Sequence, residues 1–155
     1  MTDTDVRLVK VAPEHLEVLF EQQLDPEATR MAAFPSRDRD AFMAHWAKIV
    51  VNPTGTARAI LVDGRVAGNI VAFAAGGETL VGYWLGREFW GQGIATRALA
   101  AFLQLVPTRP LLAHVAKHNV GSIRVLGKCG FTVAREERAA DGGEEIDELV
   151  MELAH

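Results

Sequence analysis

Cysteine and long apolar runs are the two features that this sequence most lacks. Cys129 is the only cysteine among 155 residues, so no disulfide can form within the chain. No apolar run reaches the roughly 18 residues that a membrane-spanning helix needs, and the polar start MTDTDVRL does not resemble a signal peptide. We therefore expect one domain over residues 1–155, a cytoplasmic location and no contact with a membrane.

Acidic residues are absent from residues 89–135, although the whole chain has a net charge of −4. The same stretch contains six basic residues: Arg97, Arg109, Lys117, Arg124, Lys128 and Arg135. An acid-free stretch in an acidic protein predicts a site for a negatively charged ligand. The overall acidity argues against nucleic acid as a partner, because nucleic acid is bound by basic surfaces.

The spacing of apolar and turn residues predicts an α+β chain. Strands are expected at 5–11, 59–62, 65–73, 79–85, 111–115, 131–138 and 145–153, and helices from Pro13 to near Asp25, from Asp38 or Asp40 to Asn52, at 93–106 and from Asn119 to Lys128. Residues 26–37 show no period and are expected to be irregular. Asp63-Gly64 predicts a type I′ hairpin turn, and residues 141–143 predict the last turn. The strand–helix–strand unit at 79–115 needs a crossover, which places one parallel pair inside a mostly antiparallel sheet.

Gly91-Gln92-Gly93 precedes a predicted helix without a Ser, Thr, Asp or Asn cap. A helix N-terminus leaves N–H groups without partners, and glycines allow an anion such as phosphate to approach them. The P-loop pattern Gly-x4-Gly-Lys-Ser/Thr is absent. A dinucleotide site is also disfavoured, because Thr96 stands where the third small residue belongs and no acid follows before Glu136.

Three motifs together resemble the GNAT superfamily of acyl-coenzyme A-dependent N-acetyltransferases. Trp90-Gly91-Gln92-Gly93-Ile94-Ala95 resembles its pyrophosphate loop Gln/Arg-x-x-Gly-x-Gly/Ala, with Trp90 in place of the first residue. Asn119-x-x-Ser122 followed by Lys128-x-Gly130-Phe131 resembles its second signature, and Gly82-Tyr83-Trp84-Leu85 the strand before the loop. The aromatic residue before the glycines and the Asn-x-x-Ser pair are most similar to the branch of ribosomal-protein N-terminal alanine acetyltransferases.

The resemblance implies a GNAT fold with a mixed, mostly antiparallel central sheet, a splayed parallel pair of strands at 79–85 and 111–116, and helices on both faces. It implies that acetyl-coenzyme A lies between these strands, with no metal. The coenzyme contacts that it implies are Trp84, Leu85, Gly86, Gly91, Gln92, Gly93, Ile94, Ala95, Thr96, Asn119, Ser122 and Lys128.

The resemblance also implies transfer of an acetyl group to a primary amine, of a protein N-terminus or a small molecule, by direct attack in a ternary complex. Many GNAT enzymes place a tyrosine that protonates the leaving thiolate seven residues after the motif asparagine, where this chain has Leu126. Tyr83, the only tyrosine, is expected to lie on the wrong strand to act as this acid. Ser122 is therefore the expected contact of the sulfur. A non-catalytic acyl-coenzyme A binding module is the alternative function, and both a monomer and a homodimer fit.

The sequence leaves three alternatives for removal of the proton from the amine. Glu78 precedes the strand at 79–85 and is the first candidate, acting through a water molecule. His114 on the strand at 111–115 is the rival. An α-amino acceptor with a pKa near about 8 is the third alternative, because it needs no dedicated base.

Overall fold

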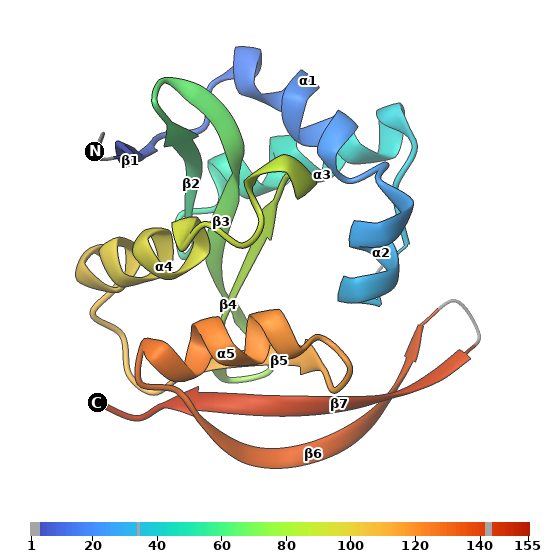
Figure 1. Ribbon diagram of the computed structural model, residues 1–155, viewed down its shortest axis with the longest axis vertical. Helices are drawn as coiled ribbons and strands as arrows, with labels where there is room; N and C mark the ends of the chain where they lie inside the picture. Colours follow the sequence, from blue (N-terminus) through green and yellow to red (C-terminus); the bar gives the residue numbers. More distant parts are fainter. Residues whose placement is uncertain (1–3, 34, 142–143) are drawn as a thin grey trace.

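A seven-stranded sheet forms the centre of the computed structural model, which describes residues 4–33, 35–141 and 144–155 (Figure 1). The strands are β1 (Val6–Val9), β2 (Thr56–Val62), β3 (Arg65–Ala75), β4 (Glu78–Leu85), β5 (Leu111–Ala116), β6 (Thr132–Asp141) and β7 (Glu144–Leu153). The helices are α1 (Pro13–Gln22), α2 (Pro26–Ala32), α3 (Arg39–Val51), α4 (Ile94–Leu105), α5 (Val120–Lys128) and the short 3-10 helix η1 (Arg87–Phe89). Across the described residues, no helix is both long and apolar enough to span a bilayer.

The strand order is β1-β2-β3-β4-β5-β7-β6, and every neighbouring pair except one is antiparallel. The exception is β4 with β5, which is parallel and has one registered pair, Leu80 with Leu112. The expected mixed sheet with a parallel pair produced by a crossover helix is therefore confirmed. Beyond Leu80 and Leu112, the facing edges of β4 and β5 have no ladder partner in each other.

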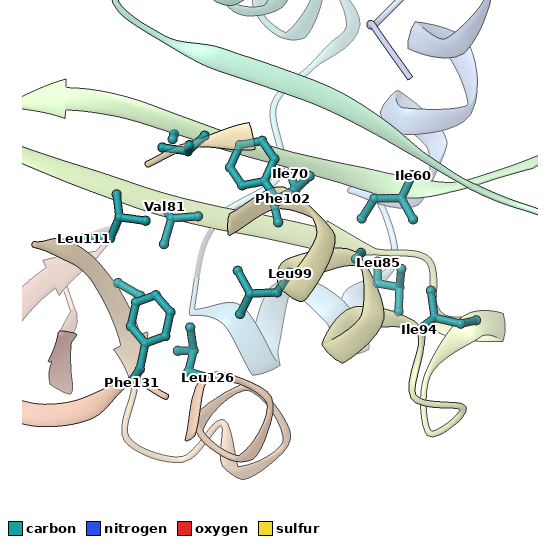
Figure 2. Close-up of a cluster of buried hydrophobic side chains, with 14 of the residues drawn as sticks. Ile60, Ile70, Val81, Leu85, Ile94, Leu99, Phe102, Leu111, Leu126 and Phe131 are labelled. Atoms are coloured by element: carbon teal, nitrogen blue, oxygen red, sulfur yellow. The ribbon is translucent and has the colours of Figure 1, made fainter. Parts of the chain in front are cut away.

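Two apolar clusters hold the helices on opposite faces of the sheet. On one face, α4 and α5 pack through side chains such as Leu99, Phe102 and Leu126 against the central strands (Figure 2). On the other face, α1 and α3 pack through Leu19, Phe42 and Trp46. The alternation of β4 follows from these faces, because Val81, Tyr83 and Leu85 point toward α4 and α5.

The ends of the elements form as their local sequence dictates. Asp38 accepts a hydrogen bond from the backbone N–H of Ala41 (2.8 Å) and thereby caps α3. In the β2–β3 turn, both Asp63 (φ 49°) and Gly64 (φ 82°) have positive φ, as a type I′ turn requires. Gly130 (φ 98°) ends α5, and the N–H of Phe131 returns to the carbonyl of Leu126 (3.0 Å).

The expectation that residues 26–37 are irregular is wrong for its first part, because Pro26–Ala32 form α2. Asp25 accepts a hydrogen bond from the N–H of Glu27 (3.2 Å), and Pro26 occupies the first helical position. An aspartate followed by proline is thus a helix start as well as a helix stop. The predicted turn at residues 141–143 cannot be compared, because 142–143 lie outside the described residues.

Phe102 on α4 tests how far the fold depends on the face that packs against α4. Its side chain is fully buried, whereas Leu105 on the same helix is 47% exposed. We expect Phe102→Ala to lower the free energy of unfolding by about 3–5 kcal/mol, because transfer and cavity costs add. The matched control Leu105→Ala should change it by less than about 1 kcal/mol. Urea denaturation followed by far-ultraviolet circular dichroism measures both; equal losses would contradict the packing.

Candidate active site

A cavity of about 750 Å³ lies between the end of β4, the N-termini of α4 and α5, and α2. It begins where β4 has left its single pairing with β5. Its walls are formed by residues of four segments: Ala28, Met31 and Ala32 of α2; Tyr83, Trp84 and Leu85 of β4; Phe89, Trp90, Gly91, Gly93, Ile94, Ala95 and Thr96 around the start of α4; and His118, Asn119, Val120, Gly121, Ser122, Arg124, Val125 and Lys128 around α5. The cavity is large enough for an extended organic ligand.

The start of α4 offers this cavity a row of free backbone donors. The first hydrogen bond of the helix runs from the N–H of Arg97 to the carbonyl of Gly93 (3.1 Å). Among the described residues, no N–H of residues 91–96 has an acceptor, and Gly93 provides no side-chain cap. Gly91 (φ 73°) and Gly93 (φ 76°) are both left-handed, and a Cβ at either position would meet nothing within 4 Å. The loop thus presents N–H groups to an open space, which is the geometry of an anion site.

Two side-chain contacts fix this loop from behind. The indole Nε1 of Trp90 donates to the carbonyl of Leu85 (2.9 Å), which ties the loop to the end of β4. The side-chain Nε2 of Gln92 donates to the carbonyl of Glu88 (2.8 Å). Trp90 therefore replaces the usual Gln or Arg of the loop with a residue that holds the backbone in place.

Only two of the six basic residues of the 89–135 stretch line the cavity. Arg124 and Lys128 lie four residues apart on α5 and so share one side of the helix. Arg97 donates to the carbonyl of Thr4, and Arg109 to that of Val106. The remaining two pair with acids of β6: Lys117 with Glu136 and Arg135 with Glu137. Of the predicted anion-binding charge, only Arg124 and Lys128 lie at the cavity, and the other four basic residues bond to groups elsewhere in the structure.

Tyr83 lies on β4, the strand where the sequence placed it, but that strand brings its side chain into the cavity wall. Its hydroxyl is 2.6 Å from the Ser122 Oγ, although the two residues belong to β4 and α5. Burial raises the pKa of Tyr83 to about 12, while the Ser122 hydrogen bond acts in the opposite direction. The alternation of β4 carried the signal, since position 83 shares its face with the core residues Val81 and Leu85.

The structure brings together most of the predicted coenzyme contacts. Ten of them line the cavity: Trp84, Leu85, Gly91, Gly93, Ile94, Ala95, Thr96, Asn119, Ser122 and Lys128. Asn119 also caps α5, because its Oδ1 accepts from the N–H of Ser122 (3.2 Å). Gly86 and Gln92 lie outside the cavity wall. The N–H of Gly86 is bonded to the carbonyl of Ala67 (2.8 Å) and its own carbonyl accepts from Phe89 (2.9 Å), so its backbone is already engaged.

Neither predicted base lines the cavity. Glu78 stands at the start of β4, and its carboxylate lies 3.7 Å from the guanidinium of Arg135. The Nδ1 of His114 lies 2.7 Å from a carboxylate oxygen of Glu148. Glu137 belongs to the same group, since one carboxylate oxygen each of Glu137 and Glu148 and a ring nitrogen of His114 all lie within 4.8 Å of one another. Glu78 is therefore held by Arg135 and His114 by Glu148, and both lie outside the cavity wall.

The α2 side of the cavity has no counterpart in the sequence motifs. Ala28, Met31 and Ala32 form this wall, and the ring nitrogen Nε2 of His118 is 2.9 Å from the carbonyl of Arg30. The contact joins the loop before α5 to the last turn of α2. Ala28, Met31 and Ala32 are small or apolar, so they give α2 no chemical signature in the sequence. Only the fold reveals its position at the cavity.

Cys129 does not resemble a nucleophile. Burial raises the pKa of its thiol, and its Sγ contacts the carbonyl of Thr96 (3.6 Å). It is not part of the cavity wall. A raised pKa at a helix C-terminus disfavours the thiolate that an acyl-enzyme intermediate would need.

Comparison with known proteins agrees with this geometry. Residues 5–132 match the family model of the acetyltransferase (GNAT) domain. Curated protein sequences yielded no match. The chain belongs to the GNAT acetyltransferase family, and the expected α+β fold of that family is confirmed.

Three solved structures illustrate how far the fold is shared. A GNAT-family acetyltransferase from Bacillus anthracis is 16% identical, with a TM-score of 0.82 over 96% of this chain and 94% of its own. The ribosomal L7/L12 alpha-N-protein acetyltransferase RimL in complex with coenzyme A is 19% identical, with a TM-score of 0.82 over 96% and 93%. Spermidine N-acetyltransferase from Vibrio cholerae in complex with coenzyme A and spermine is 12% identical, with a TM-score of 0.83 over 96% and 95%.

Titration of the only tyrosine tests the placement of Tyr83. We expect its near-ultraviolet tyrosinate absorbance to rise with a midpoint near pH 12 in the folded protein, against about 10 for an exposed tyrosine. Because the fold favours the neutral phenol, the stability that Tyr83 contributes is complete below about pH 10 and is lost as the pH rises toward 12. Ser122→Ala should raise the midpoint further, because the Ser122 hydroxyl can turn to donate to the phenolate once it forms, which lowers the pKa of Tyr83. A midpoint near 10 in the folded protein would contradict this burial.

Proposed function

We propose that the protein is an acetyl-coenzyme A-dependent N-acetyltransferase that acts on a primary amine by direct attack in a ternary complex. The observation that carries the proposal is the row of acceptor-free N–H groups at residues 91–96, five of which line the cavity together with Arg124 and Lys128. A helix N-terminus with two neighbouring cations suits a pyrophosphate. Membership of the acetyltransferase family supports acetyl-coenzyme A as the ligand that contains this pyrophosphate.

In the proposed complex, the pantetheine arm runs from this loop along the free edge of β4 at Trp84 and Leu85. Its sulfur then lies near Ser122, in the part of the cavity that also contains Tyr83. The amine nitrogen attacks the thioester carbon, and a backbone N–H of β4 stabilises the oxyanion. The C–S bond breaks with its electron pair moving to sulfur, and the Ser122 hydroxyl donates to the developing thiolate.

The amine must lose a proton before or during the attack. Glu78 and His114 do not line the cavity, and His118, which does, has its ring Nε2 engaged with the carbonyl of Arg30 (2.9 Å). We therefore propose that water takes the proton, directly or on the way to one of these groups. This favours an acceptor whose pKa is near about 8, such as an α-amino group, over a lysine-like amine of about 10.

The α2 wall is the proposed route of the acceptor. It lies across the cavity from the start of α4 and is formed by small and apolar side chains. RimL is named for acetylating the N-terminus of a ribosomal protein, and the Vibrio cholerae enzyme for acetylating spermidine. A peptide N-terminus and a polyamine are therefore the two acceptor classes to compare first.

Substitution of Gly93 tests the anion loop. We expect Gly93→Asp to weaken binding of coenzyme A by at least about tenfold, because it adds a negative charge and a side-chain cap at the proposed pyrophosphate position. Gly64→Asp is the matched control: Gly64 also has a positive φ (82°) and open space around a Cβ, but it lies in the β2–β3 turn. Its affinity should match that of the wild type. Isothermal titration calorimetry measures both, and retained affinity in Gly93→Asp would refute the loop assignment.

An amine panel tests the activity. The purified chain is incubated with acetyl-coenzyme A and, separately, an alanine-terminated peptide, spermidine, an amino acid and an aminoglycoside, and thiol release is followed. We expect release with at least one amine, and the peptide to exceed spermidine at neutral pH because its amine is less protonated. Binding of coenzyme A without release from any amine would favour a binding module over an enzyme. Absence of binding at millimolar coenzyme A would overturn the proposed function.

A further inference from the structure

Tyr83 and Ser122 form a contact that the proposed chemistry has not yet used. The phenol oxygen of Tyr83 lies 2.6 Å from the Ser122 Oγ, and both side chains line the cavity. Each is held by regular structure: Tyr83 by β4, which pairs with β3 along its length, and Ser122 by the first turn of α5, where Asn119 accepts from its N–H. The contact between the two hydroxyls is therefore a fixed feature of the site.

Either hydroxyl can donate in this contact by its geometry. Tyr83 is half-buried, and the Ser122 Oγ is the only hydrogen-bond partner of its hydroxyl among the described residues. If Ser122 donated instead, the Tyr83 proton would have no partner in the described part of the chain. With Tyr83 as the donor, the Ser122 proton makes no hydrogen bond to the described part of the chain, so it remains available to a ligand in the cavity.

We propose that Tyr83 is a positioning residue that donates to the Ser122 Oγ and thereby directs the Ser122 proton at the sulfur of the coenzyme. This inference rests on the proposed function and adds the group that controls the leaving thiolate. Ser122 alone can rotate its hydroxyl toward the helix carbonyls behind it. Tyr83 occupies the Ser122 lone pair and disfavours that rotation.

Tyr83 keeps its own proton throughout this step. Its pKa is raised to about 12 by burial, well above the roughly 8.5 of an ordinary thiol. The thiolate therefore does not remove the proton of Tyr83, and the electron pair of the broken C–S bond stays on sulfur, stabilised by the two successive hydrogen bonds. The thiolate takes its proton from water after the product separates. The phenol reaches the sulfur region from β4, whereas position 126 on α5, where the family pattern has its tyrosine, holds the core residue Leu126.

A double-mutant cycle tests the proposal. We expect Tyr83→Phe to lower kcat by about tenfold while the KM for acetyl-coenzyme A changes by less than about twofold, because one hydrogen bond to the thiolate network is lost without loss of packing. In a Ser122→Ala background, the same change should alter kcat by less than about twofold, since the partner is already gone. Thr79→Val is the control, because it removes a hydroxyl from the same strand outside the cavity wall. It should leave kcat unchanged.

Titration of the bound coenzyme A thiol provides a measurement that would not change if the role of Tyr83 were purely structural. The ultraviolet absorbance of the thiolate reports its pKa in the binary complex, without an acceptor amine. We expect this pKa to be lower when bound to the wild type than to Tyr83→Phe or Ser122→Ala, and equal in those two variants. Equal pKa values in wild type and Tyr83→Phe, or equal fold-losses of kcat in both backgrounds, would overturn the role of Tyr83. A wild type that binds coenzyme A but acetylates nothing would defeat the proposed function and still leave this titration decisive.

Discussion

The single registered pair between β4 and β5 is the constraint on which the site depends. Because Leu80 and Leu112 are paired and later residues are not, the sheet stays continuous at its centre while one edge of each strand becomes free. An unpaired strand edge is normally a liability that proteins cover. Here the cavity, the start of α4 and the start of α5 lie around that edge, so the interruption of the ladder is the place where the proposed coenzyme would pair with β4.

Each wall of the cavity adds a different type of interaction. The N-terminus of α4 contributes oriented N–H groups, and Arg124 and Lys128 on α5 contribute full charges. Between them, Tyr83 and Ser122 form a half-buried polar pair. The arrangement separates the proposed anion-binding end of the cavity from the end that contains this pair. A hydrogen bond in such a partly buried place is stronger than one in water, because the local dielectric constant is lower.

Local features of the fold and of the loop could be predicted from the sequence, and contacts between distant segments could not. Asp63-Gly64, Asn119 and Gly91-Gln92-Gly93 each determine their own backbone geometry, so their turns, cap and anion loop follow from a few adjacent residues. The pairing of Tyr83 with Ser122 joins positions 39 residues apart and depends on how α5 packs on β4. Helix α2 was hidden for another reason: Asp25-Pro26 is compatible with both the end of one helix and the beginning of the next.

The bare start of α4 has a consequence for how this protein can change over evolution. Residue 93 is the N-cap, where aspartate, asparagine or serine would satisfy the open donors and stabilise the helix by roughly 0.5–2 kcal/mol. The same donors are those proposed to hold the ligand. Helix stability and ligand affinity therefore compete for one set of N–H groups, and a protein selected only for thermostability would drift toward a closed, non-binding loop.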